Sequence, residues 1–135
     1  MVKLPYDRSG RWLPKPVQWV GGSLFALRQF PVEVRREMGQ ALWFAQMGDK
    51  HPSAKPLKGF GGAGVMEIVD DHRGDTYRAV YTVRFARAIY VLHAFKKKSK
   101  RGIKTPGHEI DLIESRLNWA RADYERRLKE SGDEG

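Results

Sequence analysis

The sequence predicts an α+β fold, in which two N-terminal helices and one C-terminal helix pack on a twisted, mostly antiparallel sheet. Two helical patterns support this prediction, because apolar side chains recur every three or four positions in residues 31–47 and 110–128. The third observation is a run of three strand-like segments between residues 65 and 95. With a short strand and a short helix ahead of them, these segments give the order β-α-α-β-β-β-α, with the helices expected on one face of the sheet.

The first elements follow a proline-rich leader. Residues 17–20 read as a short strand that two glycines stop, and Ser23 is a candidate cap for a short helix. Pro31 suits the first turn of a second helix, whose apolar face consists of Val34, Met38, Ala41 or Leu42, and Ala45. The stretch 48–64 is rich in Pro, Lys and Gly, so we expect a surface loop there.

The strand-like segments span residues 65–69, 76–85 and 88–95, and the short polar turns between them predict antiparallel hairpins. In the second segment Tyr77, Ala79, Tyr81 and Val83 alternate with a set that includes Arg78 and Arg84, so one face can line a core while the other offers cations. The third segment is apolar on both faces and is expected to be central. The last helix carries its apolar residues at helical spacing: Ile110, Ile113, Leu117, Ala120, Tyr124 and Leu128.

Length and composition predict one globular domain. The chain has 135 residues, of which 41% are hydrophobic and 30% charged. We expect a leader in residues 1–16, a single domain in 17–130 and a frayed tail in 131–135. Since no apolar run approaches the roughly 20 residues of a membrane span, and since the chain has no cysteine, we expect a cytoplasmic protein that does not associate with membranes.

The charge distribution points to a polyanionic partner. The net charge is +9, and residues 1–108 hold 20 Lys and Arg against 8 Asp and Glu, whereas residues 109–135 hold 5 against 8. The positive field therefore belongs to the body of the domain, where it would attract nucleic acid. The alternative is a cationic protein without such a partner.

The densest basic segment is residues 96–104, directly after the third strand-like segment. It has six bases in nine positions and no acid. Such a segment repels itself, so packing cannot explain it, whereas several cations next to a strand end could hold phosphates. The alternative is a solvated, charged loop.

A glycine-rich segment, residues 56–64, precedes the first of the three strands. Its four glycines could let backbone N–H groups approach an anion, and Lys58 could add charge. It is not a P-loop, because the Gly-Lys-Ser/Thr ending and the following helix are missing. A flexible connection between helix and strand is the alternative.

Arg78 and Arg84 are expected in one strand, three alternations apart, so we expect them to share a face, and an arginine fork suits a phosphate. The alternative is a pair of sheet arginines that are paired with acids. The four histidines are far apart in sequence and no cysteine accompanies them, so no metal site is expected. His93 reads as a core histidine or a catalyst, and Glu67 as a sheet carboxylate or a general base. Five aromatic residues are expected in the core: Trp19, Phe25, Phe30, Trp43 and Trp119.

Five motifs, in order, carry a family resemblance over roughly residues 17–125: Pro56-Leu57-Lys58-Gly59, Met66-Glu67-Ile68, Tyr77-Arg78-Ala79-Val80-Tyr81, Leu92-His93-Ala94-Phe95-Lys96-Lys97-Lys98, and Thr105-Pro106 followed by a helix. In these motifs the chain resembles the phage-derived, HigB-like branch of the RelE/ParE toxin superfamily. The resemblance implies a RelE-like fold and the toxin of a type II toxin–antitoxin system. It also implies a metal-independent endoribonuclease without a cofactor, which cuts messenger RNA in the ribosomal decoding site and so inhibits translation.

The resemblance implies partners and roles as well. The partners would be the ribosome with its message and a HigA-like helix-turn-helix antitoxin, through which alone the pair would bind operator DNA. Arg78 would stabilise transition-state charge, while Lys97 and Lys98 would hold phosphate and protonate the leaving group. Lys58 or Glu67 could be the base. From the basic segment and the strand alternation, the RNA-binding candidates are Lys96, Lys100, Arg101, Arg84 and Lys104.

Two other functions stay open. ParE-like members of the same superfamily inhibit DNA gyrase, and fold alone does not separate the two activities. The dense set of cations argues for the nuclease, because a protein-directed inhibitor has less need to hold phosphate. The third alternative is a noncatalytic RNA-binding module, whose lysines would hold the backbone while strand aromatics stack on bases.

Overall fold

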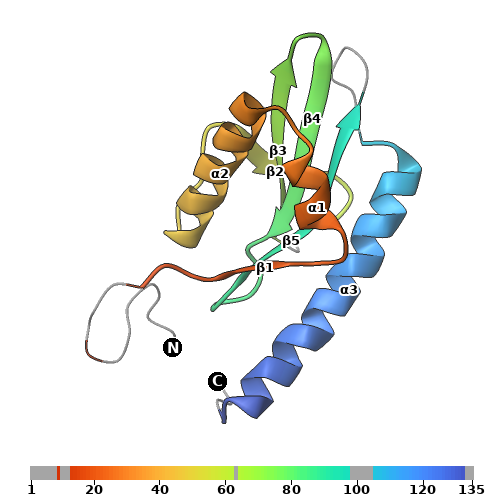
Figure 1. Ribbon diagram of the computed structural model, residues 1–135. Coiled ribbons are helices and arrows are strands. Elements are labelled where there is room, and N and C mark those ends of the chain that lie inside the picture. Colours follow the sequence, from red (N-terminus) through yellow and green to blue (C-terminus); the bar gives the residue numbers. More distant parts are fainter. Residues whose placement is uncertain (1–8, 10–12, 63, 98–104, 133–135) are drawn as a thin grey trace.

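The predicted fold class is confirmed. The computed structural model describes residues 9, 13–62, 64–97 and 105–132 (Figure 1). Their order is β1 (Val17–Trp19), α1 (Ser23–Arg28), α2 (Val32–Gln46), β2 (Ala54–Pro56), β3 (Val65–His72), β4 (Asp75–Thr82), β5 (Ile89–Lys97) and α3 (Gly107–Glu130). The sequence therefore predicted every element except β2.

The five strands form one sheet in the order β1-β5-β4-β3-β2. β1 runs parallel to β5, and the other neighbours are antiparallel. β4 is thus the middle strand, while the doubly apolar β5, which we expected to be central, is interior and second from one edge. β2 pairs with β3 at the opposite edge, where Ala54 faces Ile68 and Pro56 faces Met66. Pro56 gives β2 the composition of a loop. The proline is tolerated because β2 is an edge strand, whereas a central strand needs the N–H that proline lacks.

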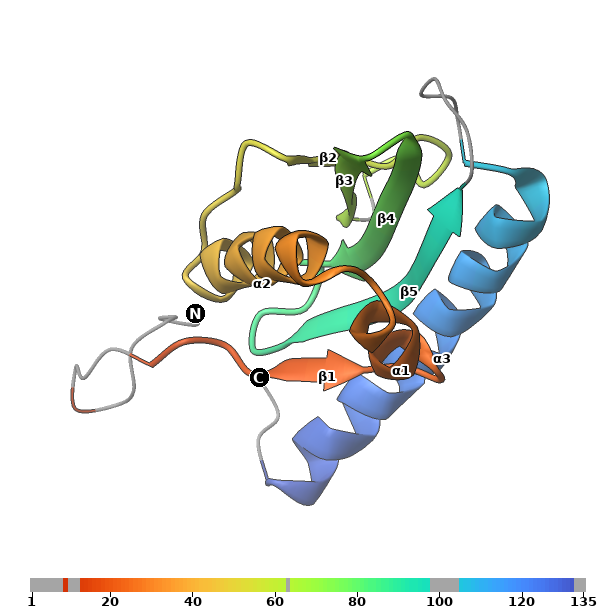
Figure 2. The ribbon, with the colours of Figure 1, turned by 45° about the horizontal axis from the view of Figure 1, so that its top comes forward.

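The expectation that the helices share one face of the sheet is wrong, because they cover both faces (Figure 2). Residues of α1 and α2 pack on one side with Ile68, Ala79 and Val91. α3 packs on the other side with Val80 and Leu92, and we call this side of the sheet the α3 face. The physical reason is that β4 and most of β5 are buried on both faces, so each face must be covered.

A β-bulge in β5 sets the direction of the side chains that follow it. Val80 pairs with His93 and Tyr81 with Val91, so Leu92 is an extra residue on β5. At the bulge, Val91 O accepts from Val20 N–H at 2.9 Å and from Ser23 Oγ at 3.1 Å, and Leu92 O accepts from Arg116 Nη1 at 2.9 Å.

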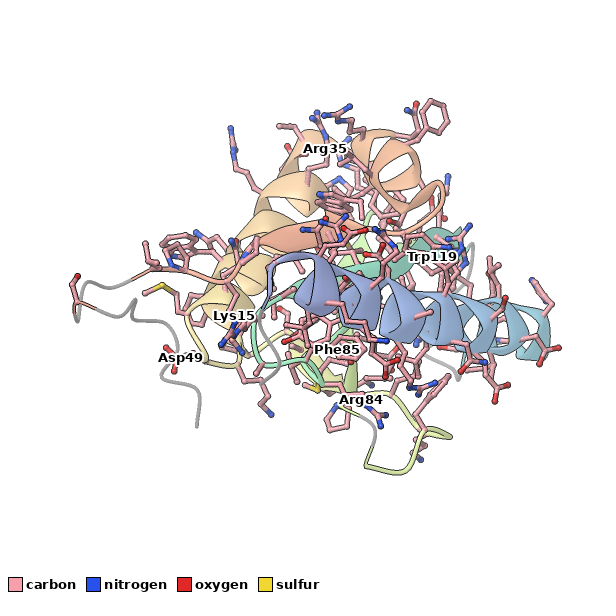
Figure 3. The ribbon with its side chains drawn as sticks, turned by 90° about the horizontal axis from the view of Figure 1, so that it is seen from below. Lys15, Arg35, Asp49, Arg84, Phe85 and Trp119 are labelled. Atoms are coloured by element: carbon pink, nitrogen blue, oxygen red, sulfur yellow. The ribbon has the colours of Figure 1, made fainter. Side chains whose placement is uncertain are left out.

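Three of the five aromatic residues expected in the core are exposed instead. Phe25 on α1 is 70% exposed, Trp43 on α2 is 45% exposed and Trp119 on α3 is 54% exposed. Figure 3 shows where Trp119 lies on α3. Phe30 is buried, and Trp19 is half-buried against the α1 and α2 side of the core. The helices turn the three exposed rings away from the sheet, which aromatic composition alone does not reveal.

None of the helices in the described part of the chain is both long enough and apolar enough to cross a membrane.

Candidate nucleic-acid interface

The centre of the α3 face holds a buried ion pair between Arg78 on β4 and Glu67 on β3. Arg78 Nη1 lies 2.8 Å from Glu67 Oε1, and the two residues are 3% and 5% exposed. Thr105, just before α3, completes the cluster: its hydroxyl accepts from Arg78 Nη1 at 3.3 Å and donates to Glu67 Oε1 at 3.5 Å. Arg78 and Glu67 are diagonal neighbours across the two strands, because Glu67 faces Val80 and Val69 faces Arg78.

This pairing bears on two sequence-based interpretations. β4 is buried on both faces, so it does not present the open row of cations that its alternating pattern suggested. The alternative interpretation, a sheet arginine that is paired with an acid, describes Arg78 in this conformation. Because Arg78 is only 3% exposed, its guanidinium is shielded from solvent in this conformation.

The strand register separates the lysines at the end of β5. Lys97 faces Thr76, and Phe95 faces Arg78, so all four residues lie on the α3 face. Lys96 faces Tyr77 instead, on the side of α1 and α2, and its Nζ lies 3.4 Å from Asp75 Oδ2. Among the described cations of the basic segment 96–104, Lys97 therefore lies on the same face as Arg78 and Lys96 does not. Four further predicted residues lie outside the described part of the chain: Lys98, Lys100, Arg101 and Lys104.

A second polar cluster joins β5 to α3. His93 Nε2 lies 2.5 Å from Glu109 Oε1, and His93 Nδ1 lies 3.4 Å from Arg116 Nη1. The ring of Phe95 stacks on His93, with centroids 5.1 Å apart and an interplanar angle of 25°. His93 is thus a half-buried histidine with both ring nitrogens engaged. No sequence pattern indicated that Glu109 faces His93.

Lys55 is a cation that no sequence motif indicated. It faces Glu67 directly in the pairing of β2 with β3, and directly opposed residues share a face, so Lys55 lies on the α3 face. Its side chain is exposed. The sequence did not indicate the position of Lys55 because β2 was not predicted.

Lys58 and Arg84 lie away from the ion pair. Lys58 is exposed on the connection between β2 and β3, where it lines a cavity of about 530 Å³ together with Leu57 and Phe60. Arg84 is exposed after the end of β4, beside that connection (Figure 3). The expectation that Arg78 and Arg84 share a strand face is therefore wrong, because β4 ends at Thr82.

A further polar cluster ties α3 to the sheet. The buried Asp123 accepts from Tyr90 Oη at 2.8 Å, from Arg127 Nε at 2.7 Å and from Arg126. Burial by itself would raise the pKa of Asp123, but the hydrogen bonds from Tyr90 and the two arginines outweigh it and hold the pKa below its ordinary value. Burial raises the pKa of Tyr90, and its hydrogen bond to Asp123 adds to the effect.

The chain belongs to the family of phage-derived Gp49-like proteins (DUF891), whose model matches residues 26–118. No curated protein matches the chain. Among solved structures it is similar to a chain in the crystal structure of the toxin–antitoxin complex RelBE2 from Mycobacterium tuberculosis. The sequence identity is 17% and the TM-score 0.43, over 64% of this chain and 94% of that one.

Proposed function

We propose that this protein is the toxin of a type II toxin–antitoxin pair, and that it is an endoribonuclease that cuts messenger RNA on the ribosome. Three lines of support converge on this function. The five sequence motifs resemble HigB-like toxins, the chain belongs to a phage-derived family, and the body of the chain carries the excess of positive charge.

The observation that carries the proposal is the arrangement around Arg78. A buried ion pair contributes little stability compared with apolar residues of the same size, so stability alone does not explain a guanidinium in the middle of this sheet. Lys97 lies on the same face, two residues beyond the Phe95 that faces Arg78. Lys55 lies on that face too, on β2 directly opposite Glu67. Together they offer positive charge on both sides of the Arg78–Glu67 pair.

The proposed reaction is an internal transfer at an RNA phosphate. The 2′-oxygen forms a bond to the adjacent phosphorus while the bond from phosphorus to the 5′-oxygen breaks. Arg78 stabilises the charge of the phosphorane when the phosphate displaces Glu67 from the guanidinium, and the freed Glu67 carboxylate takes the proton of the 2′-hydroxyl. Lys97 or Lys98 protonates the departing 5′-oxygen, and Lys58 is the alternative base. None of these steps requires a metal ion or a cofactor.

The proposed partners follow from the same assignment. A HigA-like antitoxin with a helix-turn-helix domain would neutralise the toxin and carry the complex to its operator. The proposed site of action is the bacterial cytoplasm, where the ribosome and its message are the targets.

Expression of the wild-type chain alone, followed by mapping of the new RNA ends, tests the proposal. We expect growth arrest and new 5′ ends at translated positions, both suppressed when an adjacent helix-turn-helix gene is co-expressed. Arrest with intact messages and gyrase-linked DNA breaks would favour the ParE-like function instead. Binding of RNA without arrest or cutting would favour the noncatalytic module.

A further inference from the structure

Phe95 is an aromatic side chain in the middle of the proposed RNA-contacting face. It faces Arg78 directly across the pairing of β4 with β5, and Lys97 follows it two residues later on the same side of the strand. Phe95 is half-buried, and neither apolar core cluster includes it. Core packing therefore does not account for its position.

The ring of Phe95 is held in place by the cluster around His93. The His93 ring stacks on it at 5.1 Å between centroids. His93 is fixed in turn by Glu109 Oε1 at 2.5 Å on one ring nitrogen and by Arg116 at 3.4 Å on the other. Since both partners come from α3, the long helix braces an aromatic ring that lies on the sheet.

We propose that Phe95 is a stacking platform for one unpaired nucleobase of the RNA, next to the phosphate that Lys97 contacts. This inference rests on the proposed function and deepens it, because it assigns a base-contacting residue to the same face. Every nucleobase has a π face, so a fixed aromatic ring binds single-stranded RNA with little demand on sequence. Residues two apart in a strand are roughly 6.6 Å apart along it, so Phe95 and Lys97 can contact the base and the phosphate of one nucleotide.

The ring could instead serve only to cover the Arg78–Glu67 pair, and substitutions of different shape separate the two roles. Phe95→Leu keeps an apolar cover but removes the π face, whereas Phe95→Trp keeps a stacking surface. Phe25→Ala is the matched control, since Phe25 is 70% exposed on α1 and remote from the α3 face. Thermal unfolding of each variant shows whether the fold persists.

The probe is a short single-stranded oligoribonucleotide that carries 2-aminopurine and is 2′-O-methylated so that it cannot be cut. Stacking quenches the fluorescence of 2-aminopurine. We expect the wild type, Phe95→Trp and Phe25→Ala to quench it equally. Phe95→Leu should lose the quenching and bind about 10-fold more weakly.

Mapping of RNA ends in cells that express each variant separates failure of this inference from failure of the proposed function. A wild type that cuts messages but does not quench the probe, or a Phe95→Leu variant that quenches it fully, overturns the stacking platform alone. A wild type that quenches the probe through Phe95 but leaves messages intact overturns the nuclease and supports the platform.

Discussion

Arg78 on β4 and Glu67 on β3 form an ion pair with 2.8 Å between Nη1 and Oε1, and their side chains are only 3% and 6% exposed. The hydroxyl of Thr105, in the segment that leads into α3, is hydrogen-bonded to both residues of the pair. Arg78, the proposed stabiliser of transition-state charge, is therefore also buried in the interior of the protein. A loss of activity after a single substitution there could report either chemistry or folding, so a double substitution that keeps the fold is needed to separate the two.

Removal of one partner of this pair should destabilise the protein more than removal of both. Arg78→Ala leaves the Glu67 carboxylate buried without its guanidinium, which should lower the free energy of unfolding by about 3–5 kcal/mol. The double variant Arg78→Met with Glu67→Leu replaces the pair by apolar residues and should unfold close to the wild type. Urea denaturation measures both values.

The same double variant tests the chemistry. We expect it to fold and bind antitoxin but to leave messages uncut, because the proposed charge stabiliser and base are both gone. A double variant that is stable and still cuts RNA would remove Arg78 and Glu67 from the mechanism.

Lys97 and Lys96 are neighbours that lie on opposite faces of β5, which makes them a matched pair. Lys97→Ala should weaken binding of a single-stranded RNA oligonucleotide and reduce the slope of log affinity against log salt concentration by about 1. Lys96→Ala should change both quantities less, because its ammonium group lies next to Asp75 on the other side of the sheet. Equal effects of the two substitutions would contradict the assignment of RNA to the α3 face.

Asp123 should contribute to stability in a pH-dependent way. Its pKa in the folded protein lies below its ordinary value because hydrogen bonds from Tyr90, Arg127 and Arg126 outweigh the opposing effect of burial. The contribution is therefore fully present above the unfolded pKa of about 3.9 and is lost as the pH falls through the folded pKa.

We expect Asp123→Asn to lower the free energy of unfolding by about 2 kcal/mol at neutral pH, with a gap to the wild type that narrows below about pH 4. Asp111→Asn, at an exposed position of the same helix, is the control and should change little. Urea denaturation at several pH values measures the difference. A gap that is the same at pH 3 and pH 7 would show that the carboxylate charge is not what stabilises this cluster.

The periodic patterns identified α2, α3 and the three long strands because each element buries a regular face. β2 escaped detection since its three residues carry Lys and Pro, and only the pairing with β3 makes them a strand. Among the candidate site residues, the sequence grouped Arg78 with Arg84 on the basis of strand alternation. That grouping failed because the strand ends between them.

Composition and periodicity were enough to predict the α+β class and the positive body of the chain, and they pointed to Arg78, Glu67 and the basic segment 96–104. Those properties depend on composition and on spacing along one strand or helix, which are local. Three features could not be predicted in this way: Arg78 is buried against Glu67, α3 covers the opposite face from α2, and Glu109 contacts His93, whose ring stacks on Phe95. Each of these contacts joins residues from different elements, and their partners are fixed by strand register and helix packing rather than by any local pattern.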